Sequence, residues 1–387
     1  MVAGEPSGDL LAARVMQGLA QRAPDSRCEG IGGPAMLEQG LDMWHPMNAL
    51  TVFGYVDALK RLPGLLRTYS DVKRRWQSRK PAVFVGVDAP DFNLRLELQL
   101  RRAGVPTVHF VGPSIWAWRY ERIHKIRQAV SHMLVLFPFE EAIYRKEGVP
   151  VTYVGHPLAG VIPMLPDRQG VRRRLDVPQG ARVLALMPGS RASEIKLLAP
   201  RFLQTAQLLQ RQDPGLLLLA PMVNAARRDE FRSWLRRYPV ANLRILEQPG
   251  PQGRPAAWDA MEAADAVLVA SGTATLEAAL FKRPMVISYV LSPAMRRIMA
   301  WKSGQSRPSV PWVGLPNVLL NDFAAPELLQ DDATPEKLAE ASWKALTDTA
   351  YAERTAERFT QMHQSLWRDT PALAAQAILR EAGHAPA

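Results

Sequence analysis

Short apolar runs alternate with amphipathic segments along most of the chain, and this alternation constrains the fold more than any other feature. The candidate strands are brief runs of mainly aliphatic residues: 27–31, 82–87, 105–111, 132–136, 151–154, 182–187, 215–220, 243–247, 265–270 and 284–290. Segments with helical spacing lie between most of them: 8–22, 90–103, 193–211, 225–237 and 273–282. Strands that alternate with helices in this way predict an α/β fold with parallel sheets.

The chain of 387 residues is long enough for two domains. A boundary is expected within residues 155–180, where the segment GHPLAGVIPMLPDRQG ends the first series of strands. We therefore predict one Rossmann-like domain over residues 1–160 and a second over 161–345. Residues 346–387 are predicted to be helices that pack back on the first domain or on the partner subunit of a homodimer. The carboxyl ends of both sheets would border a cleft, where open α/β proteins bind ligands.

Composition narrows the class of protein. No apolar run reaches the roughly 18–20 residues of a membrane span, and no signal peptide precedes the first helix, so a cytoplasmic location is expected. Cys28 is the only cysteine, which excludes an internal disulfide and a cysteine-rich zinc site. No histidine spacing indicates a metal site. The net charge of +11 favours a polyanionic partner, which is a nucleic acid, an anionic membrane or a phosphorylated substrate.

Polar residues follow two apolar stretches of the first half. In AGEPSGD (residues 3–9), Ser7 either caps a helix or helps to form an anion-binding turn. In GVDAPDFN (residues 86–93), Asp91 stands where a helix cap is expected. Asp88 falls where a parallel strand ends, so the local pattern leaves it open between a turn residue and a site residue.

Three more segments combine a strand end with polar or aromatic residues. PSIWAWR (residues 113–119) provides either an aromatic and basic wall or core tryptophans beside a solvated helix. LMPGSRASE (186–194) and ASGTATLEAAL (270–280) each place a glycine turn before a helix, where an anion is favoured. Glu277 lies about one turn inside the second helix and could bind ribose hydroxyls; otherwise it is a surface glutamate.

Residues 51–80 form a basic amphipathic segment. Its apolar positions follow helical spacing at Leu59, Leu62, Leu66, Tyr69, Val72 and Trp76. Eight basic residues and two acids lie between Asp57 and Lys80. Such a helix either docks on an anionic membrane through its apolar side or packs that side on the core.

Taken together, seven ordered motifs resemble lipid-A-disaccharide synthase: AGEPSGD, GVDAPDFNLRLE, PSIWAWR, VGHPLA, LMPGSRASE, ASGTATLEAAL and LPNVLL. The resemblance runs from Val2 to about residue 330, and it departs from the family's pattern at Pro6 and Gly112. It implies a two-domain GT-B fold and an inverting, metal-free glycosyl transfer with no cofactor. The donor would be UDP-2,3-diacylglucosamine, the acceptor 2,3-diacylglucosamine 1-phosphate (lipid X), and the place of action the cytoplasmic surface of the inner membrane.

The same resemblance implies roles for individual residues. Asp88 would be the general base, and Arg191 would stabilise charge on the leaving UDP. The positions assigned to substrate binding are Ser7, Asp9, Asn93, Trp116, Arg119, Gly189, Ser190, Ser271, Gly272, Thr273, Glu277 and Asn317. The membrane contacts would be Leu59, Leu62, Leu66 and Tyr69.

Rival interpretations are a GT-B transferase or epimerase that uses UDP-N-acetylglucosamine, a nucleic-acid-binding protein and a non-catalytic membrane module. The first shares the nucleotide site but should lack the DAPDFN and PSxWAW motifs. No RRM, KH or helix-turn-helix pattern supports the second, so no nucleic-acid partner is expected. The third leaves the nucleotide cradle unexplained.

Overall fold

The computed structural model describes residues 1–50, 55–247, 253–293, 295–297 and 311–383. The chain divides into two compact units. The first contains Met1–Gly160 and Ser365–Ala387, and the second contains Val161–Gln364. Residues 346–364 thus belong to the second unit, whereas the sequence analysis groups them with the last helix.

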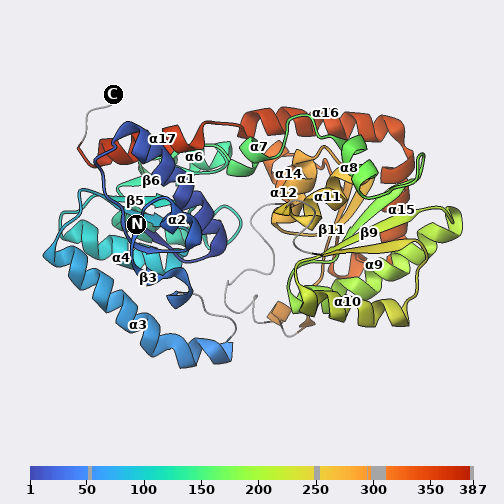
Figure 1. Ribbon diagram of the computed structural model, residues 1–387, viewed down its shortest axis with the longest axis horizontal. Helices are drawn as coiled ribbons and strands as arrows, with labels where there is room; N and C mark the ends of the chain where they lie inside the picture. The colour runs from blue at the N-terminus through green and yellow to red at the C-terminus, as the bar shows by residue number, and fades with distance from the viewer. Residues whose placement is uncertain (51–54, 248–252, 294, 298–310, 384–387) are drawn as a thin grey trace. The chain divides into compact units, whose positions relative to one another are not determined.

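The first unit is built on a seven-stranded sheet in which every pairing is parallel, in the order β3-β2-β1-β4-β5-β6-β7 (Figure 1). The strands are β1 (Val2–Ala3), β2 (Glu29–Gly32), β3 (Asp42–Pro46), β4 (Phe84–Val87), β5 (Thr107–Phe110), β6 (His132–Val135) and β7 (Val151–Tyr153). Residues in β4, β5 and β6 are buried throughout, as expected where helices cover both faces of a parallel sheet.

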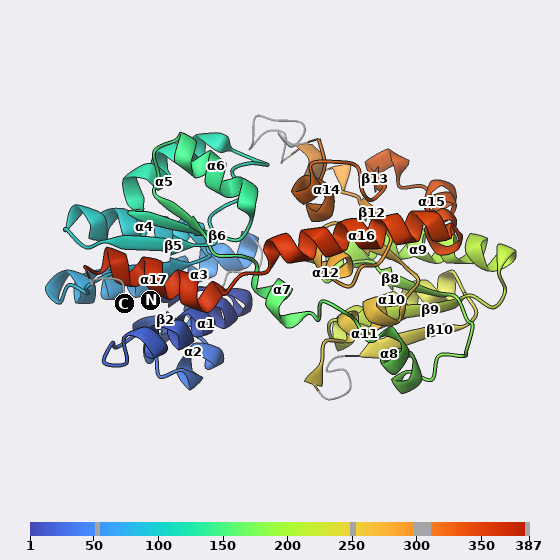
Figure 2. The ribbon, with the colours of Figure 1, turned by 90° about the horizontal axis from the view of Figure 1, so that it is seen from above.

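Helices lie on both faces of this sheet. They are α1 (Pro6–Arg22), α2 (Pro34–Glu38), α3 (Tyr55–Ser78), α4 (Pro90–Arg102), α5 (Ile123–Ala129), α6 (Pro138–Lys146), α7 (Pro157–Val161) and α17 (Thr370–Glu381). Alternate residues of β4 face opposite cores. Val85 packs with apolar residues of α1 and α17, which lie side by side (Figure 2). Phe84 packs with Trp76 of α3 and Leu96 of α4.

The second unit has a six-stranded parallel sheet in the order β10-β9-β8-β11-β12-β13. Its strands are β8 (Val183–Met187), β9 (Leu217–Met222), β10 (Leu243–Glu247), β11 (Ala266–Ala270), β12 (Met285–Tyr289) and β13 (Glu327–Leu329). Its helices are α8 (Arg168–Arg174), α9 (Ala192–Gln212), α10 (Ala225–Arg237), α11 (Ala256–Ala263), α12 (Thr273–Leu280), α14 (Leu315–Leu320), α15 (Pro335–Thr347) and α16 (Thr349–Leu366). The core of one face lies between the sheet and α9, α10 and α15.

The predicted α/β class with parallel sheets is confirmed, and a strand lies at each of the ten predicted positions. The sequence did not predict β3, because DMWHP has few apolar residues, or β13, which has three residues. The strand before the first helix has only two residues. Val2 nevertheless pairs on both sides, with Ile31 of β2 and Gly86 of β4. No described helix is both long enough and apolar enough to cross a membrane.

Candidate active site

Asp88 follows the last residue of β4 at the carboxyl edge of the first sheet. Its N–H donates to the Phe110 carbonyl of β5 over 2.8 Å, which ties the turn to the neighbouring strand. Asp88 and Ala89 both have left-handed backbone, with φ of 53° and 43°. Two such residues in succession store strain, and strain of this kind is concentrated at functional sites.

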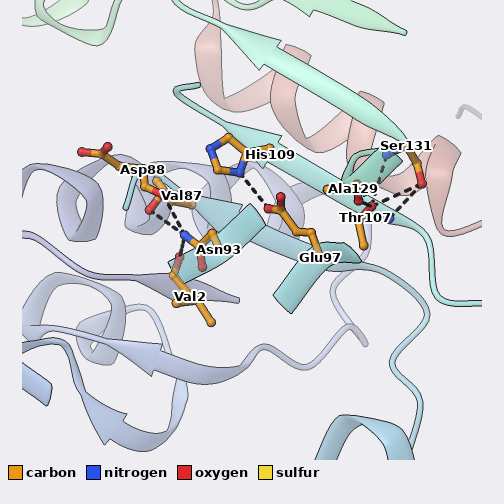
Figure 3. A network of polar contacts seen from close by, with 9 residues as sticks. All are labelled: Val2, Val87, Asp88, Asn93, Glu97, Thr107, His109, Ala129 and Ser131. Carbon is orange, nitrogen blue, oxygen red and sulfur yellow. Dashed lines mark hydrogen bonds and ion pairs between the residues drawn. The ribbon is translucent and has the colours of Figure 1, made fainter. Parts of the chain in front are cut away.

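Asn93 of α4 holds this strained turn in place. Its side-chain amide donates to the carbonyls of Val2, Val87 and Asp88, at 3.4, 3.3 and 2.7 Å (Figure 3). The side chain is fully buried. The donors of the Asn93 amide are thus engaged with the backbone of the turn that carries Asp88. The contact of Asn93 with substrate stays a prediction.

The two aspartates of this segment lie in different surroundings. Burial raises the pKa of Asp88, although the Ala89 N–H and the nearby His109 act in the opposite direction. Asp91 is exposed and pairs with Arg122 at 2.6 Å. Asp91 is also in the first turn of α4 and not at its N-cap, which is Ala89, so the predicted cap was misplaced. A carboxylate that is largely removed from water, at a strand's carboxyl end, is the better candidate for a base.

Ser7 and Asp9, which were also predicted to bind substrate, lie in the first turn of α1. Ser7 is exposed in that turn. Asp9 is buried, and its carboxylate accepts the N–H groups of Gly33, Ala35 and Met36 at 2.8, 2.9 and 3.1 Å. Asp9 therefore caps α2 with both of its oxygens, and its contact with substrate stays a prediction.

The predicted aromatic wall is partly a packing element. Trp116 is half-buried, lies edge-on to Phe139 with ring centroids 5.3 Å apart, and donates its indole N–H to Glu140. Burial raises the pKa of Glu140 to about 7, although its hydrogen bonds oppose this. Arg119 is exposed, in left-handed backbone, and lies 3.4 Å from Glu121. Arg119 and Ser114 are the exposed members of this motif.

In the second unit, the turn before α9 is closed by one of its own residues. The Glu194 carboxylate accepts the N–H groups of Ser190 and Arg191 at 2.9 and 3.1 Å. Gly189 has a φ of 112°, and a Cβ at this position would overlap the Glu194 side chain. The predicted anion cradle at Gly189 and Ser190 thus already holds a carboxylate. Arg191 projects its guanidinium outward, 3.3 Å from Glu194 and largely exposed.

The amino end of α12 is different. Ser271 donates its hydroxyl to the Val313 carbonyl, and the Thr275 N–H and hydroxyl both bond to the Gly272 carbonyl. The N–H groups of Thr273 and Ala274 have no acceptor in the part of the chain that the structure describes. A helix end with free N–H groups favours an anion. Of the two glycine turns, this one is the candidate phosphate site.

Glu277 and Asn317 have contrasting positions. Glu277 is half-buried on α12, and burial raises the pKa of its carboxyl group to about 7, against the effect of a hydrogen bond from Trp258. Asn317 is fully buried. Its amide bonds to the Ala325 backbone and to Glu327, each at 2.8 Å. Asn317 thus secures the loop before β13, and its contact with substrate stays a prediction.

The four residues predicted to contact the membrane all belong to helix α3. Leu59 and Leu62 lie outside the described side chains, which begin in this helix at residue 63. Leu66 is 54% exposed. Tyr69 is half-buried, packs edge-on against Phe92 and donates its hydroxyl to the Arg95 carbonyl; its contact with lipid stays a prediction. The core interpretation holds for Tyr69, Val72 and Trp76, and the surface interpretation is left for Leu66.

Sequence reasoning missed three residues of these sites. Glu194 was read only as part of a motif, Asn93 was read as a ligand contact, and His109 was given no part in a site. The available signal was a glutamate three residues after the helix start at Arg191, the pattern of a capping box. Within the described ranges no group of three or more His, Cys, Asp or Glu residues is arranged to hold a metal ion.

Known proteins similar to this chain agree with one another. The sequence profile of the family described as lipid-A-disaccharide synthetase matches residues 1–378. Lipid-A-disaccharide synthase of Bordetella petrii is 73% identical over 384 residues, which cover 99% of this chain and 98% of the relative. The enzyme of Chromobacterium violaceum is 49% identical over 382 residues, 99% of this chain and 96% of the relative.

Solved structures of low sequence identity share the fold. HepE of Anabaena, in complex with UDP and glucose, has a TM-score of 0.57 at 15% identity and covers 98% of this chain and 97% of its own. The UDP complex of MnaA from S. aureus has a TM-score of 0.62 at 11% identity, with 98% and 93% covered. The predicted GT-B fold with a helical C-terminal tail is confirmed. From its relatives, the chain belongs to the lipid-A-disaccharide synthetase family, whose members are glycosyltransferases of lipid A biosynthesis.

Proposed function

We propose that the protein joins UDP-2,3-diacylglucosamine to lipid X and forms the β-1,6-linked lipid A disaccharide 1-phosphate and UDP, with inversion at the anomeric carbon. The observation that carries this proposal is Asp88. It is a half-buried carboxylate in a strained turn at the carboxyl edge of the first sheet, held there by Asn93. Such a placement suits a general base.

The reaction needs one proton transfer and one displacement. Asp88 takes the proton of the acceptor's 6-hydroxyl as that oxygen forms a bond to the donor's anomeric carbon. The bond from this carbon to the UDP oxygen breaks in the same step, and the electron pair leaves with UDP. Attack from the face opposite UDP inverts the configuration, so no glycosyl-enzyme intermediate is needed.

Two features of the second unit suit the UDP part of the donor. The N–H groups of Thr273 and Ala274, which have no acceptor among the described residues, would bind the pyrophosphate, and the exposed Arg191 guanidinium would supply positive charge. Glu277, one turn along α12, is placed for ribose hydroxyls. Ser271 and Gly272 shape the turn before that helix end.

One assay tests the reaction. Purified protein is incubated with UDP-2,3-diacylglucosamine and lipid X, and UDP and the disaccharide are measured together. Equimolar UDP and β-1,6 disaccharide are expected. UDP release from UDP-N-acetylglucosamine, without a disaccharide from the acylated pair, would favour the rival GT-B transferase or epimerase.

The pKa of Glu277 predicts a pH dependence of UDP binding. Ribose hydroxyls donate hydrogen bonds to an ionised carboxylate, and with a pKa of about 7 this group is mostly protonated at pH 6 and mostly ionised at pH 8. UDP should therefore bind roughly tenfold more tightly at pH 8 from this group alone, since a pKa near 7 leaves about a tenth of it ionised at pH 6.

Calorimetric titration of UDP at both pH values checks this, with Glu277→Gln beside the unmodified protein. The comparison removes the contribution of UDP's own ionisation. The variant should lose the part of the pH dependence that belongs to Glu277. Equal pH dependence in both proteins would contradict the ribose role.

We also propose that the protein acts at the anionic cytoplasmic surface of the inner membrane, through the exposed part of α3. Leu66 is exposed there and Arg67 beside it is exposed too; further along the same helix lie the exposed Arg74 and Arg75, which pair with Asp71. An exposed apolar side chain on a helix with exposed cations suits an anionic lipid surface. A homodimer through the C-terminal helices stays a prediction, which sedimentation velocity tests.

Leu66→Ser is expected to weaken binding to vesicles that contain phosphatidylglycerol, measured by cosedimentation, while the thermal midpoint stays unchanged. Leu165→Ser is the matched control, because Leu165 is 86% exposed and belongs to the second unit and not to α3. Equal vesicle binding by the two variants would contradict docking through α3.

A further inference from the structure

A buried acid–histidine pair lies below the turn that carries Asp88. Glu97 of α4 and His109 of β5 are both fully buried, and Glu97 Oε1 lies 2.7 Å from His109 Nδ1 (Figure 3). Gly86 of β4 leaves room for this carboxylate, because a Cβ at position 86 would overlap Glu97 Oε1. Neither member of the pair contacts another charged side chain among the described residues.

The burial of the pair limits where its protons can lie. An isolated net charge without solvent or a partner is very unfavourable, so a pair that is neutral overall is favoured. In two neutral forms, a glutamate with a doubly protonated histidine and a glutamic acid whose hydroxyl donates to Nδ1, His109 Nε2 carries a proton; in the third, a glutamic acid protonated on Oε2 accepts the Nδ1–H, and Nε2 carries none. The Nε2 atom is buried without a partner within the described chain, and in the first two forms it is a donor without an acceptor.

His109 lies close to the turn that carries Asp88. It pairs with Gly86 of β4, two residues before Asp88, and it acts electrostatically on the Asp88 carboxyl group. Figure 3 shows the His109 ring between Glu97 and Asp88, with the second ring nitrogen on the side of Asp88. A buried donor without an acceptor costs about 1–3 kcal/mol and calls for an explanation.

The other ionisable groups near Asp88 are already engaged. Asp91 of α4 pairs with Arg122, and Asp9 of α1 is bonded to the amino end of α2. The Asp88 carboxylate itself accepts the Ala89 N–H. His109 differs from these groups, because it acts electrostatically on Asp88 and its Nε2 atom has no hydrogen-bond partner among the described residues.

We propose that His109, oriented by Glu97, is a positioning residue for Asp88: its Nε2–H donates to the Asp88 carboxylate when that side chain turns toward it. This inference rests on the proposed role of Asp88 as base. A donor at this point fixes the direction of the carboxylate and favours its ionised form, which is the form that accepts the acceptor's proton. Glu97 has no contact with substrate in this scheme; it sets the orientation and protonation of His109.

The test removes the pair as a unit, so that no unpaired charge is left in the core. In Glu97→Leu/His109→Phe, kcat is expected to fall by about 10–100-fold, the size typical when a supporting partner of a functional group is lost. The acid limb of the pH profile of kcat/KM should move to higher pH, because the ionised carboxylate loses a donor. KM for lipid X should change little, since the pair does not touch substrate.

If the double variant does not fold, two single substitutions of His109 test the same proposal. His109→Gln keeps an N–H donor near the position of Nε2, whereas His109→Met has a similar length and no donor. The glutamine variant should stay close to the unmodified protein in its pH profile, and the methionine variant should show the loss. His132→Gln is the control, because His132 is another buried strand histidine and is hydrogen-bonded to Thr152.

The outcomes separate this inference from the role of Asp88. If Asp88→Asn is inactive and the double variant, folded by thermal melting, keeps the normal kcat and acid limb, only the His109 proposal is wrong. Equal profiles for His109→Gln and His109→Met lead to the same conclusion. If Asp88→Asn retains activity, the base assignment itself fails, and this inference fails with it.

Discussion

Replacement of Asp88 by Asn is expected to lower kcat by about 10²–10⁴, the range typical for loss of a general base. The amide has nearly the same shape as the carboxylate but cannot accept the proton of the acceptor hydroxyl. Stability should be unchanged, because Asn tolerates left-handed backbone and the φ of 53° is retained without added strain. Initial rates of UDP release at saturating substrates measure the effect, and a thermal melt verifies the fold.

Asp91→Asn provides the control for this experiment. Asp91 is three residues away in the same turn and helix start, but its side chain is exposed and paired with Arg122. Its replacement should leave kcat unchanged. Turnover by Asp88→Asn equal to that of Asp91→Asn would remove Asp88 from the reaction. The pH profile adds a second check: because burial raises the pKa of Asp88, activity in the unmodified protein should decline at a pH above the usual range of an aspartate.

The sheet architecture could be read from the sequence because parallel strands buried on both faces are short apolar runs. Residues such as Phe84–Val87 and Ala266–Ala270 have no polar member. The strands that were missed carry little such signal. β1 has two residues and is identified only by its pairing with Ile31 and Gly86. Pairing between distant segments is a tertiary property, and a local pattern does not contain it.

The sequence predicted where in the fold the site residues lie, but it predicted less well what their side chains contact. Motif order located the turns at Asp88 and Thr273. It could not tell which polar side chains bond to the chain itself, because that depends on carbonyl and amide groups from other segments. Asp9, Asn93 and Asn317 all proved to be engaged with the backbone. Polar residues beside a site thus often stabilise its backbone, and they are of the same residue types as those that bind a substrate.

The two glycine turns of the second unit illustrate the same limit. In sequence, both look like anion cradles at a helix start. In the structure, Glu194 occupies the amino end of α9, while the N–H groups of Thr273 and Ala274 at α12 are unbonded within the described ranges. The backbone donors for an anion therefore come from α12. The start of α9 contributes the side chain of Arg191, whose backbone N–H is bonded to Glu194 in that turn.

Arg191→Ala should accordingly lower kcat by about 10²–10³, the usual effect of removing one group that stabilises developing charge. The negative charge on the UDP oxygen grows as the glycosidic bond breaks. Its stabilisation by the guanidinium is therefore greater in the transition state than in the bound donor, and kcat should fall more than KM for the donor rises. Arg191→Lys should recover only part of the rate, since an ammonium cannot make a two-pronged contact with phosphate.

Arg211→Ala is the matched control, because Arg211 is an exposed arginine in the last turn of the same helix. Both variants remove one positive charge from α9, so a general effect of net charge on the binding of anionic substrates would appear in both. Only the loss of Arg191 should lower kcat. If the two variants have the same kcat, charge development on UDP is stabilised by α12 alone, and Arg191 has no catalytic part.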